Sequence, residues 1–301
     1  MSWLILAAIS YFLAAVVLVF DKFLLSHKSK DPLVYSFYVS SLSLLVFLLW
    51  PFDFSLIPSK TALVAFIAGA SFFPAIYFLN KAVKEGEADR AAAISGGVSP
   101  VLVLILSFFF LEEKLPESWL WALCLLIFGG IILSLGSVRS LGVKAHKAPP
   151  FFSFVSAVFF ALTFFSTKYV FLSTSFINGF AWTRIGLIVP VIAILLSGRL
   201  RAGIRQNPLS VSKRLFLFFA ANKTLSGVAF LLLNYAISLG SVSVINAMQG
   251  IQFMFIFFIT AAISFFRPGL VGEKPTLGVI IKKISGIVSL TIALVLLFLY
   301  S

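Results

Sequence analysis

Apolar stretches of about twenty residues follow one another along the whole chain, with only short polar connections between them. A helix needs about 20 apolar residues to cross a bilayer, and lipid offers no partner to the backbone groups of an open strand. The pattern therefore predicts an all-α polytopic membrane protein with ten transmembrane helices. The predicted segments are 2–20, 33–50, 61–80, 91–111, 118–137, 150–172, 177–197, 215–238, 242–266 and 278–300.

Composition agrees with this pattern, because hydrophobic residues make up 61% of the 301 residues and charged residues only 11%. The net charge of +13 would suit a nucleic-acid partner, but the basic residues flank the predicted helices. There they set topology and contact lipid headgroups, so we expect no nucleic acid. The single cysteine, Cys124, excludes a disulfide framework within the chain and a metal site built on cysteines. We therefore expect neither a metal nor a cofactor.

The second half of the chain repeats the first. The run 79–86 (LNKAVKEG) is similar to 233–240 (LNYAISLG), and at the same offset Gly96 falls opposite Gly250. The repeat predicts two units, each with five helices. Because five is odd, the two units must enter the membrane with opposite orientations, which is the inverted-repeat architecture of secondary transporters. The predicted units are 1–145 and 146–301.

The basic residues of the repeat change places between equivalent loops. The connection 81–90 carries three basic residues and its equivalent, 239–242, carries none, whereas 51–60 carries one and its equivalent, 198–214, carries five. An inverted repeat requires this exchange, because short loops rich in Lys and Arg stay in the cytoplasm. Counted from the amino terminus, the odd-numbered connections between the predicted helices hold nearly all the basic residues and are therefore expected in the cytoplasm. The charge count then predicts that both termini lie on the other side of the membrane, outside the cytoplasm.

Several loose motifs recur in a fixed order, and together they resemble the drug/metabolite transporter superfamily, EamA-type, in its ten-helix form. They are Asn80 to Gly86, Gly96, Pro100, Leu111-Glu112-Glu113-Lys114 and Gly129-Gly130. The resemblance covers the whole chain. It implies a central cavity lined by helices 1–4 and 6–9, opened to each side in turn as one half rocks against the other.

The chain departs from this family in two respects. Glu112 stands where the family usually has a glycine before the acidic residue, although the second half has Gly272-Glu273. The family's usual topology also places both termini in the cytoplasm, against the charge count. The orientation therefore stays open between these two indications, and the fold does not depend on it.

Two basic residues, Arg184 and Lys223, lie deep in apolar segments, whereas all ten acidic residues lie at segment ends or in connections. A charge at the centre of a bilayer costs about 2.5–3.5 kcal/mol, so it usually faces a cavity or a partner. We therefore expect the substrate to supply the negative charge, which a guanidinium can bind with two hydrogen bonds. The alternative is that both side chains extend to the membrane interface along their apolar stems.

Polar side chains on neighbouring helices complete the predicted substrate shell. Lys223, Gly227, Phe230 and Asn234 share one helix face. The alternative for the polar members of the shell is interhelical hydrogen bonding or close packing. The remaining shell candidates are Asn80, Tyr77, Asn246, Gln249, Ser95, Ser99 and Trp182. Two lysines, Lys22 and Lys168, lie near helix ends, where we expect either gate residues or contacts with the membrane interface.

These observations predict an alternating-access secondary transporter, not an enzyme, for a small anionic or zwitterionic metabolite such as an amino acid, an organic acid or a phosphorylated compound. One alternative is efflux of cationic or lipophilic drugs, although the first helix has no acidic residue before Asp21 to exchange protons. Another is translocation of an anionic lipid carrier. We expect a monomer in the plasma (inner) membrane, with the lipid bilayer and a small-molecule substrate as its partners.

Overall fold

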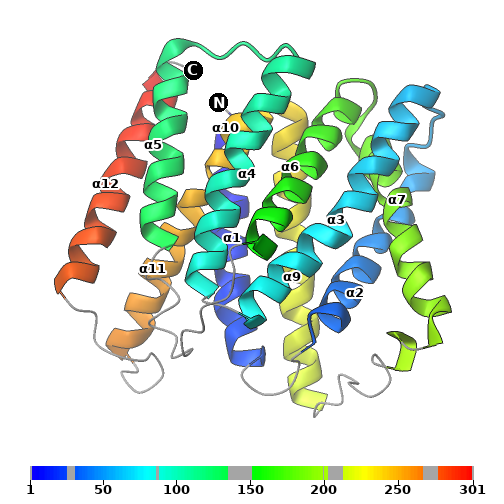
Figure 1. The fold of residues 1–301 in the computed structure, drawn as a ribbon, viewed down its shortest axis with the longest axis horizontal. Coiled ribbons are helices and arrows are strands. Elements are labelled where there is room, and N and C mark those ends of the chain that lie inside the picture. The colour runs from blue at the N-terminus through cyan, green and yellow to red at the C-terminus, as the bar shows by residue number, and fades with distance from the viewer. Residues whose placement is uncertain are drawn as a thin grey trace.

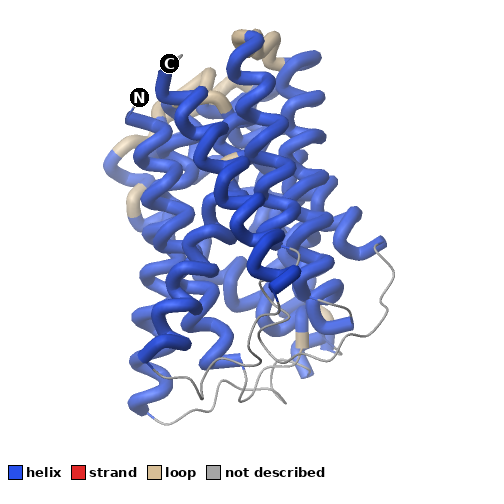
Figure 2. Tube along the Cα trace, turned by 90° about the vertical axis from the view of Figure 1, so that its left-hand side faces the viewer, coloured by secondary structure: helices blue, strands red, loops and turns tan. Residues whose placement is uncertain are grey.

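A computed structural model describes residues 2–25, 31–85, 88–134, 151–198, 200–202, 213–266 and 277–299. Within these ranges it contains eleven α-helices and no strand. The long helices run side by side as one bundle (Figure 1). The first helix begins, and the last helix ends, at the same end of this bundle (Figures 1 and 2).

Every predicted apolar segment overlaps at least one α-helix within the described residues. In the first half of the sequence these are α1 (Ser2–Leu25), α2 (Pro32–Ser43), α3 (Ser59–Glu85), α4 (Ala88–Phe110) and α5 (Glu117–Ser134), with short 3₁₀ helices η1 (Leu44–Leu48) and η2 (Trp50–Phe52) after α2. In the second half they are α6 (Phe151–Phe171), α7 (Phe176–Leu196), α9 (Lys213–Leu239), α10 (Val242–Ala247), α11 (Gln249–Phe266) and α12 (Leu277–Leu299).

The lengths of these helices suit a bilayer. Among the described residues, seven helical stretches are long and apolar enough to cross a membrane, and two shorter apolar helices, Gly96–Phe110 and Glu117–Leu133, lie beside them. The expectation of an all-helical protein with multiple membrane-spanning helices is therefore confirmed.

The second predicted segment, 33–50, is α-helical only as far as Ser43. Its start follows from local sequence, because the Asp31 carboxylate accepts a hydrogen bond from the Leu33 backbone N–H (2.9 Å) and Pro32 occupies the first turn. Beyond Ser43 the chain tightens into two short 3₁₀ helices, the second of which carries Pro51 in its first turn and ends at Phe52. The segment is therefore α-helical in its first part and 3₁₀-helical in its last part.

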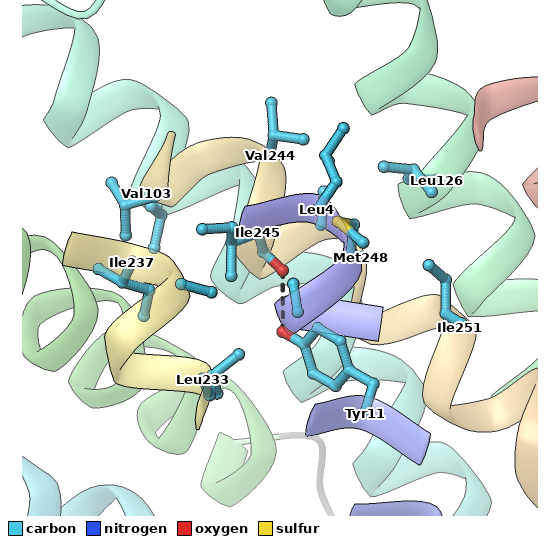
Figure 3. Packing of buried hydrophobic residues seen from close by; sticks show 14 of the residues in the cluster. Leu4, Tyr11, Val103, Leu126, Leu233, Ile237, Val244, Ile245, Met248 and Ile251 are labelled. Carbon is cyan, nitrogen blue, oxygen red and sulfur yellow. Dashed lines mark hydrogen bonds between the residues drawn. The ribbon is translucent and has the colours of Figure 1, made fainter. Parts of the chain in front are cut away.

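The ninth predicted segment, 242–266, is broken at Met248 into α10 and α11. At the break the Tyr11 hydroxyl of α1 donates a hydrogen bond of 2.8 Å to the Ile245 carbonyl oxygen (Figure 3). Leu4 and Ile251 pack around this bond in the main hydrophobic cluster. A partner from another helix thus satisfies a backbone group near the interruption, as lipid-embedded irregular backbone requires.

Helices α3 and α7 cross at two glycines. A Cβ atom at Gly186 would overlap the carbonyl oxygen of Phe66, and a Cβ atom at Gly69 would overlap that of Thr183. The two backbones are therefore in direct contact, which only residues without a side chain permit. This crossing brings the middle of α3 against the middle of α7, next to Arg184.

Candidate functional site

The Arg184 side chain of α7 is completely buried, with 0% of its surface exposed. Its guanidinium carbon lies 5.1 Å from the ring centroid of Phe72 on α3, 4.7 Å from that of Phe180 on α7 and 5.3 Å from that of Phe230 on α9. Three aromatic rings from three helices thus surround one cation. Such rings attract a cation through their quadrupoles, and more strongly where water is excluded.

The hydrogen bonds of this guanidinium are few and long. Nε donates to Thr183 Oγ1 at 3.3 Å and Nη1 donates to Ser43 Oγ at 3.4 Å. Nη2 is buried without a hydrogen-bond partner. No carboxylate in the described part of the chain pairs with Arg184, and a buried charge that lacks an ionic partner is costly. Arg184 is therefore a buried cation with one unpartnered donor group and no carboxylate partner among the described residues.

Lys223 lies on α9 two helical turns before Phe230 and on the same face, which is about 10 Å along the axis. It is half-buried, and its ammonium donates a hydrogen bond of 3.0 Å to the Tyr35 hydroxyl of α2. Between these two positions, a Cβ atom at Gly227 would meet nothing within 4 Å. Lys223, the exposed Gly227 and Phe230, whose ring contacts Arg184, therefore follow one another along one face of α9.

The two equivalent asparagines have equivalent bonds. Asn234 is buried and its Nδ2 donates to the Phe230 carbonyl oxygen at 2.8 Å, while Nδ2 of Asn80 donates to the Ile76 carbonyl oxygen at 2.9 Å. Each bond runs to the residue four positions earlier in the same helix. Asn234 is thereby tied to the backbone of Phe230, whose ring contacts Arg184.

A second polar group joins α4 to α10 and α11. Ser99 Oγ donates to Asn246 Oδ1 at 3.3 Å, and both side chains are buried. Gln249 lies beside Gly96, since a Cβ atom there would be 3.7 Å from Gln249 Oε1. The structure brings these residues together as a helix contact but shows no bond from them to Arg184. The side chain of Ser95, predicted for the same shell, lies outside the described residues.

The aromatic candidates lie away from the Arg184 guanidinium. Trp182 is two residues from Arg184, which is about 200° around a helix. It donates from Nε1 to the Ser55 carbonyl oxygen at 3.1 Å and packs on Trp50 at a centroid distance of 5.7 Å. The ring of Tyr77 stacks on Phe73 at 6.4 Å. Neither ring forms a contact with the Arg184 guanidinium.

Sequence reasoning missed Asn178, which lies fully buried in the first turn of α7. Its Oδ1 accepts from Trp50 Nε1 (3.1 Å) and from the Ser55 backbone N–H (3.3 Å). Its Nδ2 donates to Ser55 O (3.1 Å), Ser55 Oγ (2.7 Å) and Thr174 Oγ1 (2.9 Å). An amide near the start of an apolar segment was the available signal, but two of its three partner residues, Trp50 and Ser55, are more than 120 residues away in sequence.

Lys168 lies near the end of α6 and holds the end of α9. Its ammonium donates to the carbonyl oxygens of Ile237 (2.9 Å), Ser238 (3.4 Å) and Gly240 (2.7 Å). A cation in this position satisfies carbonyl groups that a helix leaves unpaired at its C-terminus and complements the helix dipole. The side chain of Lys22, its predicted counterpart, lies outside the described residues. No group of three or more His, Cys, Asp or Glu suitable for a metal is found among the residues that the structure describes.

Together, the bundle and the buried cation define a multi-pass integral membrane protein with a polar centre between its helices. In the amino-terminal part, residues 1–136 match the model of the EamA-like transporter family. The match covers the first half of the predicted repeat and does not extend over the second.

Comparison with solved structures supports the fold over the full chain. One solved chain, described only as "Crystal structure of protein", matches with a TM-score of 0.66 over 98% of each chain, at 12% sequence identity. It is one of 28 solved chains that match. At this identity the likeness concerns the fold alone. No curated protein matches the sequence.

Proposed function

We propose that the chain forms ten membrane spans arranged as two inverted five-helix halves, 1–145 and 146–301, and that it transports a small anionic or zwitterionic metabolite. Helix packing supports the repeat, because α3 packs on α6 as α9 packs on α1, and α4 packs on α6 as α11 packs on α1. Helices α5 and α12, the last helix of each proposed half, pack on each other. Exchanged pairs of this kind are expected of two inverted copies.

The buried Arg184 guanidinium carries the proposal about the substrate. It is surrounded by rings, has a buried Nη2 without a partner, and meets no carboxylate among the described residues. An amino acid, an organic acid or a phosphorylated compound would supply the missing negative charge. A cationic drug would instead be repelled by Arg184 and by Lys223, so we do not favour cation efflux.

The composition of the site suits alternating access. Ser43 and Phe72 come from the first half, and Phe180, Arg184 and Phe230 come from the second. A displacement of one half against the other therefore changes the surroundings of the guanidinium directly. A ligand that binds one arrangement more tightly shifts the population toward it. In the proposed cycle, Lys223 and Tyr35 guide the anion toward Arg184, and Asn234 holds the backbone of the contacting ring.

We further propose a monomer in the plasma (inner) membrane with both termini outside the cytoplasm. Helix α1 begins and α12 ends at one end of the bundle (Figure 2), and in the sequence the predicted connections at the carboxyl ends of α1, α3, α5, α7 and α11 are the basic ones. Short basic loops stay in the cytoplasm. A monomer suffices because one chain already contains both halves.

The test is thermal stabilisation of the purified protein by anionic, zwitterionic and cationic metabolites, since a ligand specific for the native state raises its melting temperature. Anions or zwitterions should stabilise the wild type and fail to stabilise Arg184→Ala. Arg201→Ala is the matched control, because Arg201 is exposed beyond the end of α7. Equal stabilisation of Arg184→Ala and Arg201→Ala would overturn the proposal.

A further inference from the structure

The three nitrogen atoms of the Arg184 guanidinium differ in their hydrogen bonds. Nε and Nη1 make long bonds to Thr183 and Ser43, three rings fill the space around the guanidinium carbon, and Nη2 is left without a partner. The two Nη groups form the end of a planar fork that matches the two oxygens of one carboxylate. We propose that Arg184 binds a single carboxylate carried on an apolar body, in preference to a phosphate monoester. This inference rests on the proposed function and narrows its substrate class.

Charge balance favours a monoanion at this position. Arg184 neutralises one negative charge, and Lys223 is about 10 Å from Phe230 along α9. A phosphate monoester carries close to two negative charges above about pH 6. Its second charge would remain among Phe72, Phe180 and Phe230, where an unpaired charge is costly. A carboxylate leaves no such excess.

The surroundings of the guanidinium also select the rest of the substrate. Phe72, Ile76 and Leu187 form a buried cluster on its α3 and α7 side, with Phe160 and Phe230 packed against it. The open space at Gly227 adjoins the same face of α9 as Phe230. Ligand sites typically combine mostly apolar walls with a few placed polar groups. A carboxylate at Arg184 would therefore extend an apolar body, such as an aryl or branched alkyl group, along these rings.

Titration calorimetry on the full-length protein in detergent tests this inference with three probes at about pH 8, where a phosphate monoester is a dianion. The probes are phenylpropionate, propionate and phenyl phosphate. Phenylpropionate should bind at least about tenfold more tightly than either of the others, which is a readily resolved difference in Kd. Arg184→Gln should abolish its binding. Phe230→Leu should weaken phenylpropionate several-fold while leaving propionate unchanged.

The outcomes separate this inference from the function on which it rests. Phenyl phosphate binding as tightly as phenylpropionate, or propionate binding as tightly, would overturn the substrate class and leave anion transport standing. Binding of none of the three by a cooperatively folded wild type would overturn the substrate class. The proposed function would fall as well if the anionic and zwitterionic metabolites of the thermal-stabilisation test also failed to stabilise the wild type. If Arg184→Gln does not fold, Gly227→Leu takes its place, with Gly278→Leu as control because Gly278 also has open space but lies on α12. Loss in the first variant alone supports the site, and equal binding in both contradicts it.

Discussion

Replacing Asn178 with alanine should lower the free energy of unfolding by more than the small loss of side-chain volume would suggest. The side chain is fully buried and joins α7 to the connection between α2 and α3 through both backbone groups of Ser55 and the indole N–H of Trp50. Alanine would leave these groups without their partner. Each buried polar group that loses its partner costs about 1–3 kcal/mol.

The magnitude follows from the three partners that have no obvious replacement, namely Ser55 N–H, Ser55 C=O and Trp50 Nε1–H. Three groups at about 1–3 kcal/mol each give a sum of about 3–9 kcal/mol. We expect the lower part of this range, because the hydroxyls of Ser55 and Thr174, which lose their own bonds to Asn178, can replace some of the lost bonds. A loss of about 3–5 kcal/mol is at the upper limit for a single substitution. The assay is the free energy of unfolding by denaturant titration in mixed micelles.

Asn80→Ala is the matched control for this prediction. Asn80 is half-buried and makes one short bond, to the Ile76 carbonyl oxygen of its own helix, and one long bond of 3.5 Å to Ser36 Oγ. Its loss should cost about 1 kcal/mol. If Asn178→Ala lowers the free energy of unfolding by no more than Asn80→Ala, the reasoning that this buried network stabilises the bundle is refuted.

Two further predictions concern backbone geometry. Glu112 has φ 52°, in the left-handed region that glycine adopts without strain, and its turn lets the Glu113 N–H bond the Ser107 carbonyl oxygen. Glu112→Gly should therefore raise the free energy of unfolding by about 1 kcal/mol, and Glu112→Ala should not; an equal gain in both would assign the effect to charge. Gly186→Ala should cost about 3 kcal/mol or more, because its Cβ would overlap backbone atoms. Gly227→Ala, which meets open space, should cost nothing, and comparable unfolding of the two alanine variants would contradict the close α3–α7 crossing.

The backbone conformation of Glu112 gives a physical reason for the glycine that EamA-type transporters usually have at this position. The resemblance to EamA-type transporters suggests a glycine before the acidic residue, and the left-handed φ at this position gives the physical reason for one. The sequence could show the departure but not its cause, because the conformation depends on how α4 ends and how the chain turns toward α5.

The amino-acid sequence by itself determined the number and placement of the apolar segments. The bilayer imposes a fixed thickness and tolerates no unpaired backbone, so length and composition are enough to locate a helix. The sequence also placed Asn80 and Asn234 at matching positions of two similar runs, and in the structure both form the same bond to the carbonyl four residues earlier. Arg184 was recognisable as a deep cation without a deep carboxylate.

Only the tertiary structure decided what surrounds that cation. Hydrophobicity does not distinguish a phenylalanine that faces lipid from one that contacts a guanidinium, so Phe72 and Phe180 could not be selected among 36 phenylalanines. The bonds of Asn178 to residues of another segment and the break at Met248 also depend on contacts far apart in sequence. Local composition places each helix in the membrane, but the pairing of buried polar groups is fixed only when helices from both halves meet.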